Sequence, residues 1–131
     1  MHGSYKIAGG GWVTNSEDLV AFALALLNGK LVKPETLAMM WTPVKLPGGK
    51  STNYGYGFRM TQVAGQSGVA HGGAQQGTST DLIILPDLKF VSAVVVNMNS
   101  AVMLNMNNVN ADKLNRKIVE TVLGPGTLRT N

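Results

Sequence analysis

Residues 68–99, GVAHGGAQQGTSTDLIILPDLKFVSAVVVNMN, contain three segments with the composition of β-strands. The first leads into a turn at Gly77, and the second is the β-branched and apolar run Thr80 to Leu85. The third follows a turn at Pro86-Asp87 and runs from Phe90 to Val96. Because strands joined by short turns pair antiparallel, this stretch predicts the centre of an antiparallel sheet.

Three segments outside this stretch have helix signals. The first helix is predicted to begin at a capping box, Thr14-Asn15-Ser16-Glu17, with the Thr14 hydroxyl as the cap, and to end at Asn28-Gly29. The second is predicted to begin at Pro34, and the third at the N-cap Asn110. The fold class is therefore α+β, an antiparallel sheet of about three to four strands covered by helices.

A further strand is predicted at residues 54–60, YGYGFRM, where aromatic residues alternate with glycine. We interpret the aromatic side chains as core residues, and the alternative is a platform on which a ligand stacks. The preceding residues 43–53, PVKLPGGKSTN, are rich in turn residues and predict a surface loop.

Length and composition fit one domain over residues 1–131, of which residues 1–7 are expected to be flexible. The net charge of +4 is scattered with no run of basic residues, so we expect no binding to nucleic acid. The N-terminus lacks the regions of a signal peptide, and no apolar run could span a bilayer, so we expect a soluble chain. The absence of cysteine fits a reducing and an oxidising compartment equally well.

His71 is the first candidate for chemistry, because Gly72 and Gly73 follow it in a predicted strand. Strand glycines let a ligand lie against the backbone, with the imidazole beside it. The alternative is a bulge or a tight packing contact at the glycines.

No serine among the 131 residues is followed three positions later by lysine, and none lies in a Gly-x-Ser-x-Gly elbow. Ser67 precedes His71 by four residues, which is about 13 Å along a strand and beyond hydrogen-bond reach. The four aspartates, Asp18, Asp81, Asp87 and Asp112, are dispersed and are interpreted as cap and turn residues. With two histidines and no carboxylate cluster, we expect neither a metal site nor a cofactor.

The order of these features resembles the C-terminal part of the serine β-lactamase-like family. The matching segments are AGGGWVTNSEDLVAFALALLNG, PETLAMMWTP, NYGYGF, AHGGAQQGTSTDLIILPD and a valine-rich strand that ends at Asn97. The family includes class C β-lactamases, D-alanyl-D-alanine carboxypeptidases, D-aminopeptidases and esterases. The resemblance implies a partial β-lactamase/transpeptidase-like fold that corresponds to about the last third of a typical member.

Family members combine a Ser-x-x-Lys motif, a tyrosine motif and a Lys/His-Thr/Ser/Gly-Gly triplet, and only the triplet is matched here. The resemblance implies that His71, Gly72 and Gly73 bind substrate and that the Ala74 N–H is an oxyanion-hole donor. Without the nucleophile, the chain alone is expected to be a hydrolase fragment without activity on amides or esters.

The resemblance also bears on partners, because N-terminal strands of the family pair beside the strand that corresponds here to Phe90 to Asn97. We therefore expect a homodimer or higher oligomer through this edge, and a complementing N-terminal polypeptide is a further candidate partner. The alternative function is a non-catalytic, homo-oligomeric binding or assembly module. Labelling by a serine-directed probe separates the two functions.

Overall fold

The computed structural model describes residues 11–75, 77–97 and 110–124. Its elements, in chain order, are helices α2 (Ser16–Leu27) and α3 (Pro34–Met40), strands β1 (Arg59–Val63), β2 (Gln66–Gln75) and β3 (Thr78–Leu85), the 3₁₀ turn η1 (Pro86–Leu88), strand β4 (Phe90–Val96) and helix α5 (Ala111–Leu123). The flexibility expected for residues 1–7 concerns a segment outside the described residues.

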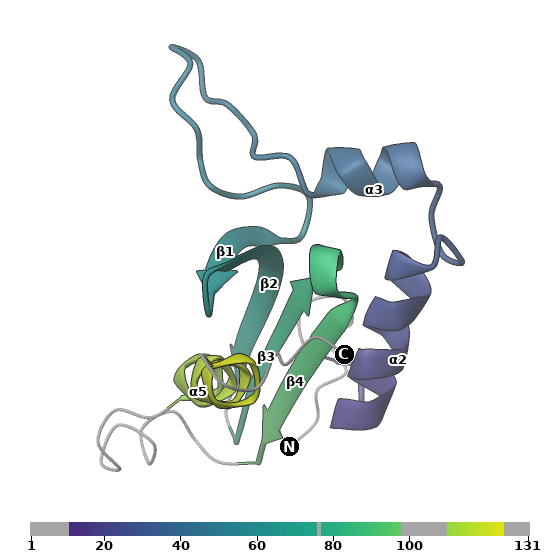
Figure 1. Cartoon of the computed structure of the whole chain (residues 1–131), viewed down its shortest axis with the longest axis vertical. Coiled ribbons are helices and arrows are strands. Elements are labelled where there is room, and N and C mark those ends of the chain that lie inside the picture. Colours follow the sequence, from purple (N-terminus) through teal and green to yellow (C-terminus); the bar gives the residue numbers. More distant parts are fainter. Residues whose placement is uncertain (1–10, 76, 98–109, 125–131) are drawn as a thin grey trace.

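The strands form one antiparallel sheet in the order β1-β2-β3-β4 (Figure 1). In its register, His71 of β2 lies opposite Leu82 of β3, which lies opposite Ala93 of β4. The predicted antiparallel sheet and the α+β class are confirmed. The sheet has two edge strands, β1 and β4, within the described part of the chain.

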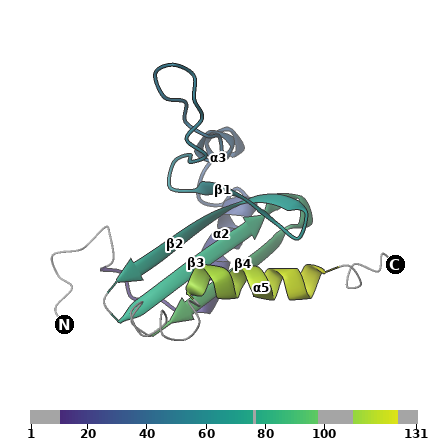
Figure 2. The same ribbon diagram turned by 90° about the vertical axis from the view of Figure 1, so that its left-hand side faces the viewer.

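Helices cover both faces of the sheet, with α5 on one face and α2 on the other (Figure 2). Successive residues of a strand point to opposite faces, so each strand contributes to two cores. The α2 face buries Ala23, Leu26, Leu37, Phe58, Val69, Leu82 and Ile84. The α5 face buries Val63, Ala70, Ile83, Leu85 and Val119.

The caps of the helices agree with the sequence signals at two ends and differ at one. Pro34 occupies the first turn of α3, and the Asn110 side chain caps α5. In α2, however, the capping side chain is Asn15, whose Oδ1 accepts from the Asp18 N–H at 2.8 Å. The Thr14 hydroxyl donates instead to the Asn15 carbonyl, so the predicted capping box is wrong by one residue.

The strand predicted over residues 54–60 is correct only for Arg59 and Met60, because β1 begins at Arg59. Before it, Tyr54 forms one isolated bridge with Arg59, and Gly57 has a φ of 79°, which a strand does not allow. The exposed fractions of Tyr54 and Tyr56 are 40% and 62%, whereas Phe58 is buried. Two of the three aromatic side chains therefore lie outside the core.

Residues 43–54 form an arm that projects from the body of the molecule beside α3 (Figure 1). The arm is held by its own backbone bonds, including Val44 N–H to the Tyr54 carbonyl at 2.9 Å and a bridge between Lys45 and Ser51. The surface loop predicted for residues 43–53 is therefore present and has a hairpin-like form.

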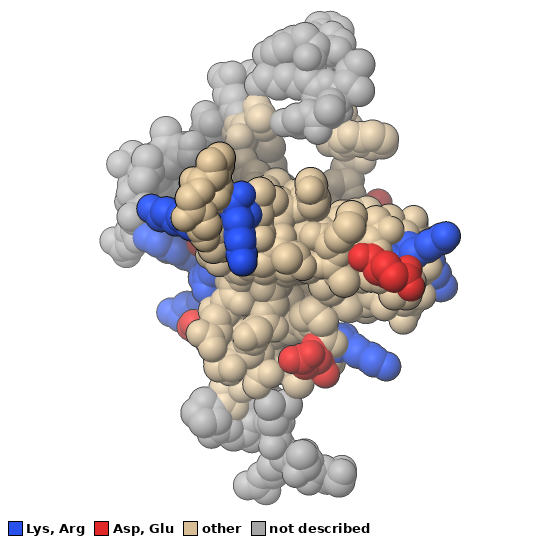
Figure 3. Space-filling view, turned by 90° about the horizontal axis from the view of Figure 1, so that it is seen from above, with Lys and Arg blue, Asp and Glu red and all other residues tan. Residues whose placement is uncertain are grey.

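Seen from above, Lys and Arg side chains fall into separate groups with uncharged surface between them (Figure 3). This view shows no continuous basic strip of the kind that tracks a phosphate backbone. None of the helices among the described residues is long and apolar enough to cross a membrane.

Candidate functional site

The candidate site lies where β2 continues beyond its partner β1. Pairing between these strands ends at Arg59 and Ala70, whereas β2 runs on through His71 and Ala74 alongside β3. On the side away from β3, no strand of the described residues pairs with residues 71–74. Alternate residues of this segment direct their backbone N–H and C=O groups to that side, where an extended ligand could bind them.

The imidazole of His71 is held at the start of this open edge. Its Nδ1 lies 2.6 Å from the carbonyl oxygen of Gly57 and 3.0 Å from the hydroxyl of Tyr54. A carbonyl can only accept, so Nδ1 carries the hydrogen and the Tyr54 oxygen shares it as a second acceptor. In the neutral ring Nε2 then has a lone pair, which can accept a hydrogen bond or a proton from a bound molecule.

The two glycines face opposite sides of the sheet and have different neighbours. Gly73 lies opposite Thr80, on the same face as His71, and a Cβ there would lie 3.0 Å from the Thr80 Oγ1. Gly72 lies opposite Asp81 on the α5 face, and a Cβ there would lie 3.2 Å from the Asp81 Oδ1. Gly73 therefore keeps the face beside His71 open, while Gly72 makes room for a buried carboxylate.

Asp81 is the centre of a polar cluster beneath the strand, although the sequence interpretation treated it as a turn residue. It lies inside β3 with no solvent exposure, and that interpretation is wrong. Its carboxylate accepts from Arg59 Nη2 at 3.1 Å and from Asn115 Nδ2 at 2.9 Å. Burial raises the pKa of Asp81 above 3.8, the ordinary value, although the bond from Asn115 and the charge of Arg59 favour the ionised form.

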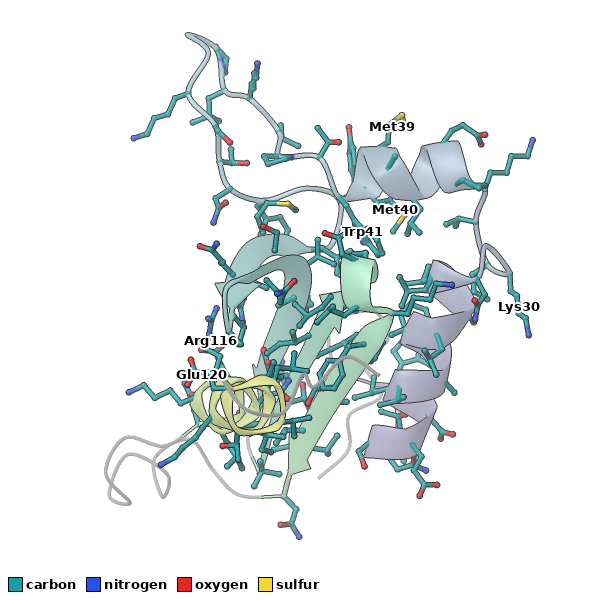
Figure 4. The ribbon with its side chains drawn as sticks, in the orientation of Figure 1. Lys30, Met39, Met40, Trp41, Arg116 and Glu120 are labelled. Carbon is teal, nitrogen blue, oxygen red and sulfur yellow. The ribbon has the colours of Figure 1, made fainter. Side chains whose placement is uncertain are left out.

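The cluster continues onto α5 and joins this helix to β1. Arg59 Nη2 also contacts Asp112 Oδ1 at 2.5 Å, and Asp112 pairs with Arg116 at 3.5 Å within the helix. Arg116 Nη2 donates to the Thr61 hydroxyl at 2.6 Å, and Figure 4 shows this arginine on the side of α5 near β1. Charged and polar groups from β1, β3 and α5 therefore fix the underside of the His71 strand.

Two cavities, each of about 380 Å³, lie on the α2 face beside the open strand. The first is apolar for most of its wall and is lined by Leu19, Phe22, Met40, Tyr56, Gly57, Phe58, His71, Thr80, Asp81 and Leu82. The second follows the strand away from His71 and is lined by Trp12, Val13, Thr14, Leu19, Gly73, Ala74, Gln75, Thr78, Thr80 and Val95. They share Leu19 and Thr80, so they are neighbours on this face, and Gly73 lines the second.

All four residues expected to bind substrate, His71, Gly72, Gly73 and Ala74, lie in β2. His71 lines the first cavity, Gly73 and Ala74 line the second, and Gly72 faces the other side of the sheet. The contact between Tyr54 and His71 does not follow from the sequence pattern, which predicts Tyr54 as a core residue. Arg59 and its carboxylate partners are likewise not predicted, although an aspartate within a β-branched strand is a signal of a buried polar contact.

The remaining candidates for chemistry in the part of the chain that the structure describes are its serines and its His, Asp and Glu side chains. Ser67 and His71 lie in the same strand, and Ser92 donates its hydroxyl hydrogen to Asn115 at 2.5 Å, an amide that cannot act as its base. No serine hydroxyl within residues 11–75, 77–97 and 110–124 is hydrogen-bonded to a lysine or histidine side chain. Within the same ranges, His, Asp and Glu form no group of three or more that could hold a metal ion.

Comparison with known proteins gives one family. The family model described as Beta-lactamase matches residues 1–116. The serine beta-lactamase-like protein LACTB, mitochondrial, is 31% identical over 110 residues in both Mus musculus and Homo sapiens. That alignment covers 64% of this chain and 20% of each relative, so the chain spans about a fifth of their length.

Two solved structures have the same fold over most of this chain. The octameric penicillin-binding protein homologue from Pyrococcus abyssi superposes with a TM-score of 0.65 at 21% identity, covering 86% of this chain and 25% of that one. The D-stereospecific amidohydrolase from Streptomyces sp. gives a TM-score of 0.58 at 25% identity, covering 82% of this chain and 29% of that one. The sheet and its covering helices thus occur as one part of larger proteins.

Proposed function

Since this chain belongs to the β-lactamase family of serine hydrolases, we propose that it supplies the substrate-binding strand of a site for acyl transfer on amides or esters. His71, Gly72, Gly73 and Ala74 bind the substrate, and the Ala74 N–H is one donor of the oxyanion hole. The observation that carries this proposal is the open edge of β2, which begins at an imidazole held by the Gly57 carbonyl.

The nucleophile, in this proposal, comes from a polypeptide segment outside these 131 residues. The supporting observation is the absence of a Ser-x-x-Lys motif and of any described serine paired with a base. An oxyanion hole without a nucleophile and its base loses several orders of magnitude in rate. These 131 residues alone are therefore a fragment of the catalytic unit and do not form an acyl-enzyme.

A fluorophosphonate probe, which labels activated serines covalently, tests this function. The chain alone should remain unlabelled. After mixing with a separately expressed polypeptide that carries the Ser-x-x-Lys half of a family enzyme, the added polypeptide should become labelled. Gly73→Val should abolish labelling in the mixture, because its side chain would fill the open face beside His71 and contact Thr80.

Ser67→Val is the matched control, because Ser67 is an exposed β2 residue outside both cavities and its loss should leave labelling unchanged. Stoichiometric labelling of the chain alone would refute the missing nucleophile. Labelling that survives Gly73→Val would refute the role of the strand. A folded mixture that never reacts would favour the non-catalytic binding or assembly module.

We also propose that residues 90–97 pair with another chain, either a second copy or a complementing polypeptide. β4 is an edge of the sheet, no described strand pairs on its outer side, and apolar edges are templates for pairing. The octameric state of the Pyrococcus abyssi homologue, to which this fold is similar, supports assembly.

Sedimentation velocity over a concentration series tests this edge. Association should weaken in Val95→Lys, which adds a charge to the β4 edge. Val44→Lys is a control of similar exposure on the projecting arm, since Val44 is 41% and Val95 38% exposed. A mass that stays monomeric at all concentrations would refute pairing between copies, and equal effects of the two variants would refute the assignment to β4.

A further inference from the structure

The cavity lined by Phe22, Met40, Tyr56, Phe58, His71 and Leu82, here called the α2 cavity, lies at the start of the open strand. Its volume of about 380 Å³ lies within the range of pockets that hold small molecules, about 300–1,000 Å³. It is built from four separate elements of the chain, α2, α3, the segment before β1 and the sheet. This mostly apolar cavity thus lies directly beside the imidazole.

The chemistry of the wall restricts what can bind there. Among the described lining residues, the carboxylate of Asp81 is committed to Arg59 and Asn115, and no lysine or arginine contributes. His71 and Thr80 are polar groups of the wall, where they can contact the polar end of a ligand. A charged group inside this cavity would lose its hydration without gaining a partner of opposite charge. The lining therefore fits a neutral, apolar group.

We propose that the α2 cavity is a specificity pocket for a neutral aliphatic or aromatic acyl group, whose amide or ester carbonyl lies against residues 72–74. This inference rests on the proposed function, because it takes the strand as the site of the carbonyl. The pocket then favours long or bulky acyl groups over an acetyl group. Each buried methylene group should tighten binding by up to about fourfold.

Two neighbouring methionines of α3 offer a direct measurement. Figure 4 shows Met40 directed toward α2 and the body of the molecule, whereas Met39 is directed away from it. Met40 lines the α2 cavity, and Met39 is 61% exposed. With ¹³C-methyl methionine in the whole chain, the Met40 methyl signal reports on the pocket and the Met39 signal is the internal control.

Three probes are titrated in turn: N-acetylglycinamide, N-hexanoylglycinamide and N-(6-aminohexanoyl)glycinamide. The hexanoyl probe should bind at least about tenfold more tightly than the acetyl probe and shift the Met40 methyl and the backbone amides of residues 72–74, but not Met39. The aminohexanoyl probe, which carries an ammonium group into the cavity, should lose this gain. Equal affinity for all three probes, or an unmoved Met40 signal, would overturn the pocket.

A pair of α2 variants separates the pocket from general effects on the fold. Phe22 lines the cavity and is 47% exposed, while Leu24 on the same helix lies outside it and is 38% exposed. Phe22→Ser should weaken the hexanoyl probe about tenfold and leave the acetyl probe unchanged. Leu24→Ser should leave both unchanged. Equal effects of the two substitutions on the hexanoyl probe would overturn the assignment.

The two readouts also separate this inference from the proposed function. If both the acetyl and the hexanoyl probe shift the amides of residues 72–74 with equal affinity, the pocket is refuted and the strand function stands. If the hexanoyl probe shifts Met40 but leaves these amides unmoved, the cavity does not serve the site and the inference is overturned. If no probe moves the amides of residues 72–74, the proposed function fails as well.

Discussion

Replacing Asn115 by leucine should weaken the attachment of α5 to the strands beneath the site. Asn115 is fully buried, and its Nδ2 donates to the Asp81 carboxylate at 2.9 Å and to the Ser92 carbonyl at 3.2 Å. Its Oδ1 accepts from the Ser92 hydroxyl at 2.5 Å. Leucine fills a similar space but makes none of these bonds, so it leaves buried polar atoms on two strands without their partner.

The magnitude follows from the bonds that are lost. The bond to the carboxylate contributes about 2 kcal/mol and each of the two bonds with Ser92 about 1 kcal/mol. Apolar burial of the leucine offsets about 1.5 kcal/mol of this loss. We therefore expect the free energy of unfolding to fall by about 2.5 kcal/mol, which corresponds to a melting temperature lower by roughly 10 °C in a chain of this length.

Urea unfolding of the purified chain at pH 7, followed by tryptophan fluorescence, measures this change. Lys117→Leu lies on the exposed side of the same helix and should change the free energy of unfolding by less than about 0.5 kcal/mol. A loss below about 1 kcal/mol for Asn115→Leu, with an unchanged dependence on urea, would refute the reasoning. The polar cluster would then not hold α5 on the sheet.

Three further predictions concern stability. The pKa of Asp81 is raised in the folded chain, so its contribution to stability is fully present below pH 3.8 and is lost as pH rises through the folded pKa. The free energy of unfolding of the parent minus that of Asp81→Asn, measured by urea unfolding, should therefore fall with rising pH. A difference that does not change with pH would contradict this. Val119→Ala should lower the free energy of unfolding by about 2 kcal/mol, because it creates a cavity under α5. A melting temperature within 2 °C of the parent, which corresponds to a loss of only about 0.5 kcal/mol, would argue against this. In urea unfolding, Gly55→Ala should cost at least about 3 kcal/mol, because its Cβ would lie 2.1 Å from the Met40 carbonyl oxygen. Gly57→Ala is the comparison, since Gly57 has a φ of 79° and open space around its Cα, and it should cost about 1 kcal/mol. Equal costs of the two variants would contradict the contact between Gly55 and Met40.

Local patterns were sufficient to predict the centre of the sheet but not its first strand. The predicted run from Thr80 to Leu85 is β-branched and apolar and is bounded by turn residues, so composition and turns identify most of β3, which begins two residues earlier at Thr78. In residues 54–58 aromatic residues alternate with glycine, which also predicts a strand, yet Gly55 packs against the end of α3 and Gly57 has a positive φ. That contact joins segments distant in sequence, and the strand pattern contains no sign of it.

The candidate site was likewise predicted only in part from local sequence patterns. His71 and Gly73 lie two positions apart in one strand, so a short motif indicates both. Asp81 contacts Arg59 in β1 and Asn115 in α5, which lie 22 and 34 positions from it in the sequence. These contacts become visible only when the register of the sheet is known. The prediction of the α2 cap was wrong by one residue, because Thr14 and Asn15 are both good capping residues and spacing alone does not choose between them.

The projecting arm offers a place to attach a reporter. At its tip, Gly48 and Gly49 have positive φ values, and a Cβ on either would have no neighbour within 4 Å. Extending a loop of this kind costs only about 0.6 kcal/mol for each doubling of its length. A fluorophore-binding tag inserted between Gly48 and Gly49 would leave the His71 strand and the β4 edge as they are, so the same labelled chain can test both the proposed substrate binding and the proposed assembly.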